Sequence, residues 1–311
     1  MNIDKTELTT ATSSTQLECI GRGECGTVWA DPGPAGDDIA RLVMKREEGG
    51  DLGHPVAIEY QVYRRLVQAS QNMHPLVINS FSIPSCHEFL DKDNIAWSEI
   101  LPRLPPNSAA CNALINEKIR PLPLSARSLL MQQYYQNHDQ DAVRNTHCLV
   151  RPYLGRRRRR SSQHGQPRFR VFNLRKFPLH QNLLAELDLD LEGYATAMAD
   201  ALAFLHWCAR VDADGVEFVL APPRPRRQPQ AQAQAEAQHP SAVDLDGGTP
   251  FGPGTATLFD SPVLGPHALW LLDFNSCQEM AMDPDGMRQA AACFWRNDPY
   301  YPRPGGVNAL D

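Results

Sequence analysis

A glycine-rich turn near the N-terminus constrains the fold of this chain more than any other feature. The pattern Gly-x-Gly-x-x-Gly-x-Val occupies residues 21–28, and strand-like apolar segments lie on both sides of it, at 17–20 and 27–30. A glycine loop that binds a dinucleotide opens a helix, whereas this one leads from one strand into another. We therefore expect an antiparallel hairpin whose turn has the character of a nucleotide-binding loop.

A lysine and a glutamate follow the hairpin at informative positions. Lys45 ends a third apolar segment (39–45), and Glu59 lies in a segment (58–66) whose apolar residues recur at the spacing of one helix face. Protein kinases have a glycine loop, a strand lysine and a helix glutamate in this order, and the last two form the ion pair that fixes the phosphate-binding geometry. The alternative is a surface ion pair, which contributes little to stability.

The remaining elements are predicted from the spacing of apolar residues. An amphipathic helix is expected from about 191 to 208 and a second helix over about 286–296. Strands are expected at the following places: around Phe81, 95–101, 148–153, 168–174, 217–220 and 268–274. This mixture of elements predicts an α+β fold.

Two segments of the second half resemble kinase motifs. Residues 202–206 resemble the end of the helix that leads into the catalytic loop, and residues 271–275 resemble the strand and Asp-Phe-Gly turn, with Asp273 as the aspartate and asparagine in place of glycine. Counting from His206 puts Asp214 at the position of the catalytic aspartate. The lysine and the magnesium-binding asparagine that follow it in kinases are absent, so ordinary phosphoryl transfer is not expected.

The loop instead contains three carboxylates, Asp212, Asp214 and Glu217. Grouped carboxylates raise one another's pKa, which allows one of them to act as a general acid or base near neutral pH. Such a group also suits a cationic substrate such as a guanidinium. The alternative interpretation is a solvated acidic turn.

Basic residues are concentrated in one segment of an otherwise acidic chain. Residues 151–176 contain ten of the 30 Lys and Arg residues and no Asp or Glu, while the whole chain has a net charge of -6. We expect this segment, with a basic hairpin loop at 155–167, to bind RNA phosphates. A solvated loop or a nuclear-import signal would have the same composition. The candidate tRNA-binding residues are Arg151, Arg156, Arg157, Arg158, Arg159, Arg160, Arg168 and Arg170.

The expected organisation is a protein-kinase-like bilobal fold. A flexible start (1–15) precedes an N-terminal lobe built on an antiparallel sheet (16–176) and a mainly helical C-terminal lobe (177–311). Residues 222–262 are rich in proline and are predicted to be a disordered insertion. No apolar stretch is long enough to span a membrane, and no signal sequence is present, so we expect a soluble cytoplasmic protein. Eight cysteines without a C-x2-C pair argue against a zinc site.

Five motifs together resemble a fungal family that is often labelled as zinc-finger proteins. They are Glu-Cys-Ile-Gly-x-Gly (18–23), Leu-His-Trp (205–207), Asp-x-Val-Glu-Phe-Val-Leu-Ala-Pro (214–222), Leu-Trp-x-Leu-Asp-Phe (269–274) and Arg-Asn-Asp-Pro-Tyr-Tyr-Pro (296–302). Members with an assigned activity are similar to arginine-containing cyclodipeptide synthases. These enzymes join arginine from arginyl-tRNA to a second aminoacyl group and close a diketopiperazine.

The resemblance implies roles for individual residues. The family signature Asp-Asp-x-x-Glu falls on residues 213–217, with Ala213 in place of the first aspartate and Asp212 one residue away. It implies that Glu217 is the catalytic glutamate. We hypothesise that Glu217 accepts the proton of the attacking α-amine and that Asp214 orients the amine or binds the guanidinium. The residues assigned to substrate binding are Asp212, Asp273, Lys45 and Glu59.

The expected partners are arginyl-tRNA and a second aminoacyl-tRNA, without a cofactor, metal, membrane or DNA. Two alternatives stay open at this point. One is a phosphotransferase that uses ATP and magnesium through Lys45, Asp214 and Asp273. The other is a pseudoenzyme that binds RNA or a protein through the basic segment.

Overall fold

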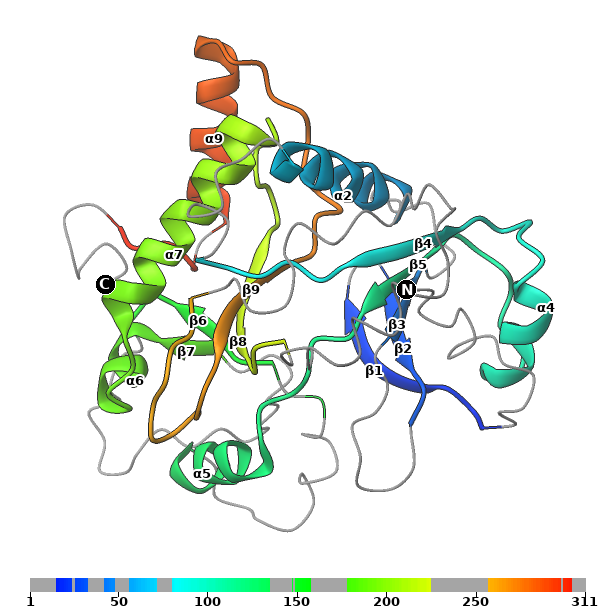
Figure 1. The fold of residues 1–311 in the computed structure, drawn as a ribbon, viewed down its shortest axis with the longest axis horizontal. Helices are drawn as coiled ribbons and strands as arrows, with labels where there is room; N and C mark the ends of the chain where they lie inside the picture. Colours follow the sequence, from blue (N-terminus) through cyan, green and yellow to red (C-terminus); the bar gives the residue numbers. More distant parts are fainter. Residues whose placement is uncertain are drawn as a thin grey trace, which may run out of the picture.

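The structure is a computed structural model with an α+β fold. It describes residues 15–23, 26–32, 42–47, 56–71, 80–134, 147, 149–157, 178–224, 257–297 and 299–303. Figure 1 shows a β-sheet on one side and most of the helices on the other, with β8 and β9 between them. The expected α+β class is therefore confirmed.

The larger sheet has five antiparallel strands. Their bounds are β1 Glu18–Gly23, β2 Gly26–Ala30, β3 Leu42–Arg46, β4 Cys86–Leu90 and β5 Ala113–Glu117. The order across the sheet is β1-β2-β3-β5-β4. The predicted hairpin is confirmed, with Gly23 opposite Gly26. Gly26 has a φ of +150°, and an added Cβ would collide with the carbonyl of Arg46, so this position requires glycine.

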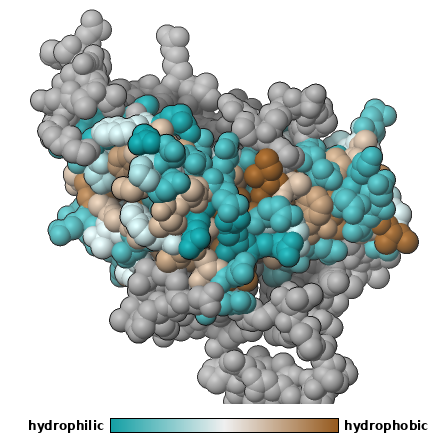
Figure 2. Space-filling model, turned by 90° about the horizontal axis from the view of Figure 1, so that it is seen from above, coloured by the Kyte–Doolittle hydropathy of each residue, from teal (hydrophilic) through white to brown (hydrophobic). Residues whose placement is uncertain are grey.

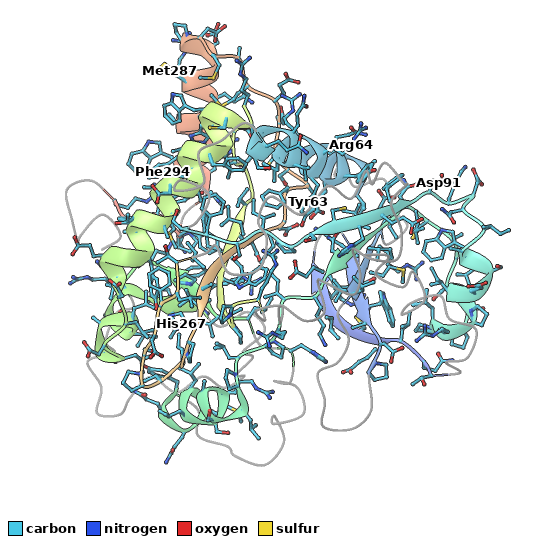
Figure 3. All side chains as sticks on the ribbon, in the orientation of Figure 1. Tyr63, Arg64, Asp91, His267, Met287 and Phe294 are labelled. Carbon is cyan, nitrogen blue, oxygen red and sulfur yellow. The ribbon has the colours of Figure 1, made fainter. Side chains whose placement is uncertain are left out.

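Helix α2 (Val56–Gln71) follows β3 and packs on the sheet (Figure 1). The predicted helix is confirmed, but its buried face differs from the expected one. Ile58 is 38% exposed, whereas Glu59, Val62 and Leu66 are buried. Tyr63 points from α2 toward the centre of the molecule (Figure 3), where its ring meets the edge of Phe274 at 5.2 Å.

The strand predicted at 95–101 is wrong, because this segment forms the short helix α4 (Trp97–Ile100) and the 3-10 turn η1 (Leu101–Arg103). The side chain of Asn94 accepts a hydrogen bond from the amide of Ala96 at 2.9 Å, and its carbonyl accepts one from Trp97 at 3.2 Å. An asparagine turn at this point starts a helix rather than a strand.

Among the elements that the sequence patterns missed are the strands β4 and β5 and the helix α5 (Leu124–Tyr134). The strand predicted around Phe81 is reduced to a single parallel bridge between Ser82 and Trp270. Through this bridge, the chain leading into β4 is hydrogen-bonded to β9.

The second half follows the predictions more closely. Helix α7 (Leu191–Ala203) continues into a π-helical turn, η4 (Phe204–Cys208), and helix α9 (Pro284–Arg296) begins at the N-cap Asp283. Strands β8 (Glu217–Ala221) and β9 (Ala268–Leu272) form an antiparallel pair. These elements confirm the predicted helices and strands of this half.

A second small sheet is parallel. Strands β6 (Arg151–Tyr153) and β7 (Pro178–His180) pair in parallel, and α6 (Gln181–Glu186) follows β7. The strand predicted at 168–174, most of the basic loop, and the bulk of the predicted insertion (225–256) lie outside the described residues.

The main hydrophobic core runs between α2 and the second half of the chain, where Leu66, Phe81, Phe204 and Phe274 are buried together. A separate cluster around Trp97 and Met44 covers the other face of the five-stranded sheet. Within the described part of the chain, no helix has the length and hydropathy needed to cross a membrane. Figure 2 shows hydrophilic side chains over much of the described surface on the side that it presents.

Candidate functional site

The predicted lysine and glutamate meet, and Asp273 joins them. The ammonium Nζ of Lys45 on β3 lies 2.6 Å from Glu59 Oε2 on α2 and 2.6 Å from Asp273 Oδ1, just past β9. The Glu59 side chain is buried, with an exposed fraction of 2%, while 34% of the Asp273 side chain is exposed. The alternative of a surface ion pair between Lys45 and Glu59 is therefore excluded. The triad of Lys45, Glu59 and Asp273 connects β3, α2 and the end of β9.

The charges within the triad depend on one another. Burial by itself would lower the pKa of Lys45, but the negative charges and hydrogen bonds of Glu59 and Asp273 outweigh it and raise the pKa. Burial raises the pKa of Glu59, and Lys45 opposes this effect. Lys45 therefore stays protonated at neutral pH.

The loop that carries the predicted carboxylates has an unusual backbone. Arg210, Ala213 and Gly215 have positive φ values of 55°, 58° and 71°, and Asp273 has a φ of 68°. Left-handed backbone at non-glycine residues costs about 1–3 kcal/mol and is concentrated at functional sites. The loop is held by the neighbouring 277–280 segment, which accepts from Asp212 N at 3.0 Å and donates to Arg210 O at 3.0 Å.

Asp212 has a structural position in this loop. Its residue is 3% exposed. Oδ1 accepts hydrogen bonds from the amides of Asp214 and Gln278, at 3.1 and 2.9 Å, and Oδ2 accepts from Gln289 Nε2 at 2.8 Å. Both carboxylate oxygens are thus already used to fix the loop.

Ala213 stands where the resemblance places the first aspartate of its signature. It is 2% exposed and lies in the left-handed region. The position therefore holds a buried methyl group, and the first acidic position of the signature contributes no charge to the site.

Asp214 is more accessible, with 27% of its side chain exposed. Its Oδ2 accepts from Arg296 at 3.0 Å, and the Arg296 side chain is 59% exposed. Its backbone is fixed separately, because its carbonyl accepts a bond from the thiol of Cys277 at 3.4 Å. The Asp214 carboxylate has a partner that solvent or a ligand can replace.

Glu217 begins β8 and forms an ion pair with Arg151 of β6. Arg151 donates twice to the same oxygen, Oε2 of Glu217, through Nε at 3.0 Å and through a terminal nitrogen. The other oxygen, Oε1, accepts from no residue that the structure describes. The Glu217 side chain is 29% exposed, whereas that of Arg151 is only 11% exposed. One oxygen is held and the second is available.

The strand register brings two of the predicted site residues, Glu217 and Asp273, to one end of the β8–β9 pair. Glu217 is opposite Leu272 in the β8–β9 pair, so it lies one residue from the strand position of Asp273. The backbones of Glu217 and Asp273 therefore lie at the same end of the β8–β9 pair.

The basic segment is described only at its start. Arg151, Arg156 and Arg157 lie in or directly after β6, and Arg157 donates to Gln181 at 2.9 Å. The remaining candidate tRNA-binding residues lie outside the described residues: Arg158, Arg159, Arg160, Arg168 and Arg170. Because Arg151 binds Glu217, the basic segment begins at the candidate catalytic carboxylate.

The segment 296–303 holds this site together, which sequence reasoning did not anticipate. Arg296 binds Asp214, and Asn297 donates to the carbonyl of Val216 at 2.7 Å. The carbonyl of Tyr300 accepts from the amide of Leu154 at 3.0 Å, next to β6. The Arg-Asn-Asp-Pro-Tyr-Tyr-Pro motif marked this segment, although its spacing did not reveal these contacts.

A comparison with models of protein families gives a match over part of the chain. A model of a family of unknown function, DUF3669, described as a zinc finger protein, matches residues 269–311. No curated protein matches the chain. The matched segment starts in β9 and includes Asp273. It also includes Arg296 and Asn297, which bind Asp214 and the carbonyl of Val216 in the 212–217 loop.

The zinc-finger description of that family has no counterpart in the described residues. Among them, no group of three or more His, Cys, Asp or Glu side chains is arranged to hold a metal ion. The cysteines at the site, Cys277 and Cys293, are buried, and burial raises the pKa of both thiols. Raised thiol pKa values disfavour the thiolate that zinc requires.

Proposed function

We propose that this chain is a tRNA-dependent cyclodipeptide synthase that joins arginine from arginyl-tRNA to a second aminoacyl group. Its scaffold is proposed to be kinase-like. The order of a glycine hairpin, Lys45 on β3, Glu59 on α2 and Asp273 after β9 supports this scaffold, since the same groups meet in kinases. The family-model match over 269–311 includes two of the motifs on which the resemblance to the synthases rests.

The observation that carries the proposal is the state of Glu217. Arg151 holds Oε2, and Oε1 accepts from none of the described residues. A general base needs one oxygen available within reach of the proton it accepts, together with a fixed orientation. The Arg151 pair supplies the orientation and the partial exposure of Glu217 supplies access.

The proposed reaction is two successive acyl transfers. The α-amine of the second aminoacyl ester attacks the carbonyl carbon of the arginyl ester. A C–N bond forms, the C–O bond to the ribose of the first tRNA breaks, and the amine's proton passes through Glu217 Oε1 to the leaving ribose oxygen. The free amine of the resulting dipeptidyl ester then attacks its own ester carbonyl and releases the second tRNA. Aminoacyl esters are already activated, so neither step consumes ATP.

The roles of the other acidic residues differ under this proposal. Asp214 has the exchangeable partner Arg296, so it is the residue proposed to bind the substrate guanidinium. Asp212 is proposed to act indirectly by fixing the loop. Arg156, Arg157 and the rest of the basic segment are proposed to bind tRNA phosphates.

The direct test uses purified protein with arginyl-tRNA and a set of other aminoacyl-tRNAs, without added ATP. Mass spectrometry should detect a cyclic dipeptide that contains arginine, and deacylated tRNA should accumulate with it. If folded protein consumes neither ester, the proposal is wrong.

A second candidate, a phosphotransferase, is favoured by the Lys45 triad alone. In that reaction Lys45 would bind ATP phosphates and Asp273 would bind magnesium. The catalytic-loop asparagine that also binds magnesium in kinases is absent from this sequence. It predicts magnesium-dependent ATP binding that Lys45→Met weakens at least about tenfold. Equal nucleotide binding by the wild type and this variant would remove the second candidate.

A further inference from the structure

Trp295, near the end of α9, has an indole ring that is both exposed and held in place. The residue is 57% exposed. The guanidinium carbon of Arg303 lies 4.6 Å from the centre of the ring, and Arg303 also donates to the carbonyl of Trp295 at 3.4 Å. The rings of Trp295 and Phe294, which Figure 3 labels on α9, meet edge to face at 5.6 Å. An exposed aromatic ring with a fixed orientation is a surface on which a flat ligand can stack.

Phe294 connects this exposed ring to the core. It stacks on the ring of Tyr301 at 4.7 Å, with 12° between the two planes, and Tyr301 is buried. The guanidinium of Arg303, two residues after Tyr301, lies 5.4 Å from the centre of the Phe294 ring as well. Trp295 and Arg303 are therefore both carried by elements that pack on the core.

Trp295 is adjacent in the chain to a residue of the proposed active site. The next residue, Arg296, binds the carboxylate of Asp214 at 3.0 Å. Consecutive Cα atoms are about 3.8 Å apart, so the backbone of Trp295 lies close to the contact between α9 and the 212–217 loop. A ligand that occupies Asp214 has the exposed ring within its surroundings.

The segment that carries Arg303 is also joined to the start of the basic segment. The carbonyl oxygens of residues 300 and 299 accept hydrogen bonds from the amides of residues 154 and 155, at 3.0 and 2.9 Å. Arg156 and Arg157 follow directly. The ring of Trp295 is therefore connected through short stretches of chain to Asp214 and to the first arginines that are proposed to bind tRNA phosphates.

We propose that Trp295 and Arg303 form a stacking platform for the terminal adenine at the single-stranded 3′ end of a tRNA. This inference rests on the proposed function, in which Asp214 binds the guanidinium of an arginyl ester. The ester of an aminoacyl-tRNA is carried by the ribose of the terminal adenosine, so the adenine has to lie near the residues that bind the amino acid. Trp295 offers the adenine an aromatic face, and Arg303 adds a positive charge beside it.

A protein partner is the competing occupant of this surface. Met287, two turns before Trp295 on α9, is also exposed, and exposed apolar side chains can mark a protein interface. Positive charge distinguishes the two occupants. Arg303 lies over the ring, and Arg156 and Arg157 follow the strand to which the Arg303 segment is bonded. Arginines combined with an exposed aromatic ring favour RNA, which supplies both phosphates and bases.

The test uses the full chain and a short single-stranded RNA that ends in CCA, carries no amino acid and has a fluorescent label at its 5′ end. Fluorescence anisotropy gives the Kd. Trp295→Leu should raise the Kd at least about fivefold, because the stacking of one base is lost. Trp295→Phe keeps an aromatic face and should recover most of the affinity. The slope of log K against log salt should be the same in all three proteins, since no phosphate contact is removed.

Trp207→Leu is the matched control. Trp207 on η4 is 62% exposed, and its ring lies beside that of His206 at 5.9 Å. Its loss should leave the Kd for the RNA unchanged within about twofold, with circular dichroism to show that each variant is folded. Equal weakening by Trp207→Leu and Trp295→Leu would overturn the inference, and so would an unchanged Kd in Trp295→Leu.

A second measurement needs only the wild-type protein. The terminal adenine of the RNA is replaced by the fluorescent base 2-aminopurine, whose emission falls when it stacks on an aromatic ring. The emission should fall on binding, and unchanged emission in the bound RNA would overturn the inference. If the wild type binds no RNA, and Trp295→Leu instead changes the oligomeric state measured by light scattering, the surface is a protein interface and the inference is also overturned.

The platform and the proposed function can fail separately. If the wild type forms no cyclic dipeptide but stacks the terminal base, the synthase is wrong and the platform stands as an RNA-binding site. In an active synthase, Trp295→Leu should raise KM for arginyl-tRNA by about the same factor as the Kd for the RNA. A cyclic dipeptide formed with the same KM by the wild type and Trp295→Leu would overturn the platform and leave the synthase.

Discussion

Glu59 Oε2 lies 2.6 Å from Lys45 Nζ, and the Glu59 side chain is almost completely buried in the interface between α2 and the five-stranded sheet. Asp273 shares the same ammonium at 2.6 Å. The triad therefore fixes three elements relative to one another: β3, α2 and the end of β9. The contribution of this triad to the free energy of unfolding can be measured without any assumption about the reaction.

Lys45→Met should destabilise the protein strongly, because it leaves the Glu59 carboxylate buried without a cation. Breaking a buried pair in this way costs about 3–5 kcal/mol. Urea unfolding measures the effect. Arg65→Met is the control, because the Arg65–Glu279 pair is also 2.6 Å long but exposed, at 36% and 69%. Its cost should stay below about 1 kcal/mol. Equal costs would mean that the triad is not buried as described.

Asp212 and Asp214 should separate into a structural and a functional residue. Asp212→Ala removes an acceptor from two amides and from Gln289, and should cost about 2–4 kcal/mol in urea unfolding. Asp214→Asn breaks only an exposed pair with Arg296 and should cost less than about 1 kcal/mol. In the synthase, Asp214→Asn should nevertheless raise KM for arginyl-tRNA. A large loss of stability in Asp214→Asn would reverse these assignments.

His267 should make stability depend on pH. It is buried, its Nδ1 lies 2.6 Å from the carbonyl oxygen of Gly265, and its Nε2 lies 2.5 Å from the hydroxyl of Tyr194 (Figure 3 labels His267). A carbonyl only accepts, so Nδ1 carries the hydrogen and Tyr194 donates to Nε2. This arrangement holds the imidazole neutral.

Burial lowers the pKa of His267 below its ordinary value of 6.5. Above pH 6.5 both the folded and the unfolded chain carry a neutral imidazole. As the pH falls below 6.5, the unfolded chain takes up a proton first, so the free energy of unfolding decreases until the pH passes the lowered pKa. Thermal unfolding as a function of pH measures this decrease. His267→Gln should flatten it, and an unchanged slope in that variant would contradict the buried neutral state.

Arg156 and Arg157 should contribute to tRNA binding through charge alone. Replacing both with Gln should weaken tRNA binding and reduce the slope of log K against log salt by about 0.7–0.9 for each phosphate that the variant no longer neutralises. Binding at several salt concentrations measures this slope. Arg288→Gln is the control, because Arg288 is also exposed but pairs with Asp285 on α9. A salt slope that is the same in the double variant and the wild type would remove these residues from the interface.

Local patterns predicted much of this fold, because several elements are determined by their own residues. The glycine hairpin, α2, α7, α9, β8 and β9 lie where apolar spacing and turn residues placed them. The error at 95–101 has the same origin, since a short apolar run fits a strand or a buried helix, and the Asn94 turn decides between them. The β5 strand was missed, because it lies in the middle of the sheet and its buried run shows no alternation.

The site was predictable in its composition but not in its pairings. The order of Lys45, Glu59 and Asp273 indicated their meeting, which the structure confirms. The Arg151–Glu217 pair joins residues 66 positions apart, and no local pattern encodes it. Asp212 was assigned to the substrate because carboxylates in a loop look alike in sequence. Only burial and hydrogen bonds distinguish the loop-fixing residue from the accessible one.

The measurement that tests the central claim most directly compares the wild type with Glu217→Gln in an expression host. Extracts are searched by mass spectrometry for cyclic dipeptides that contain arginine, with circular dichroism to show that both proteins are folded. The account predicts a product with the wild type and none with Glu217→Gln. An equal amount of product from both would contradict the role of Glu217. No product from folded wild-type protein would contradict the synthase and direct attention to ATP binding or to RNA binding without catalysis.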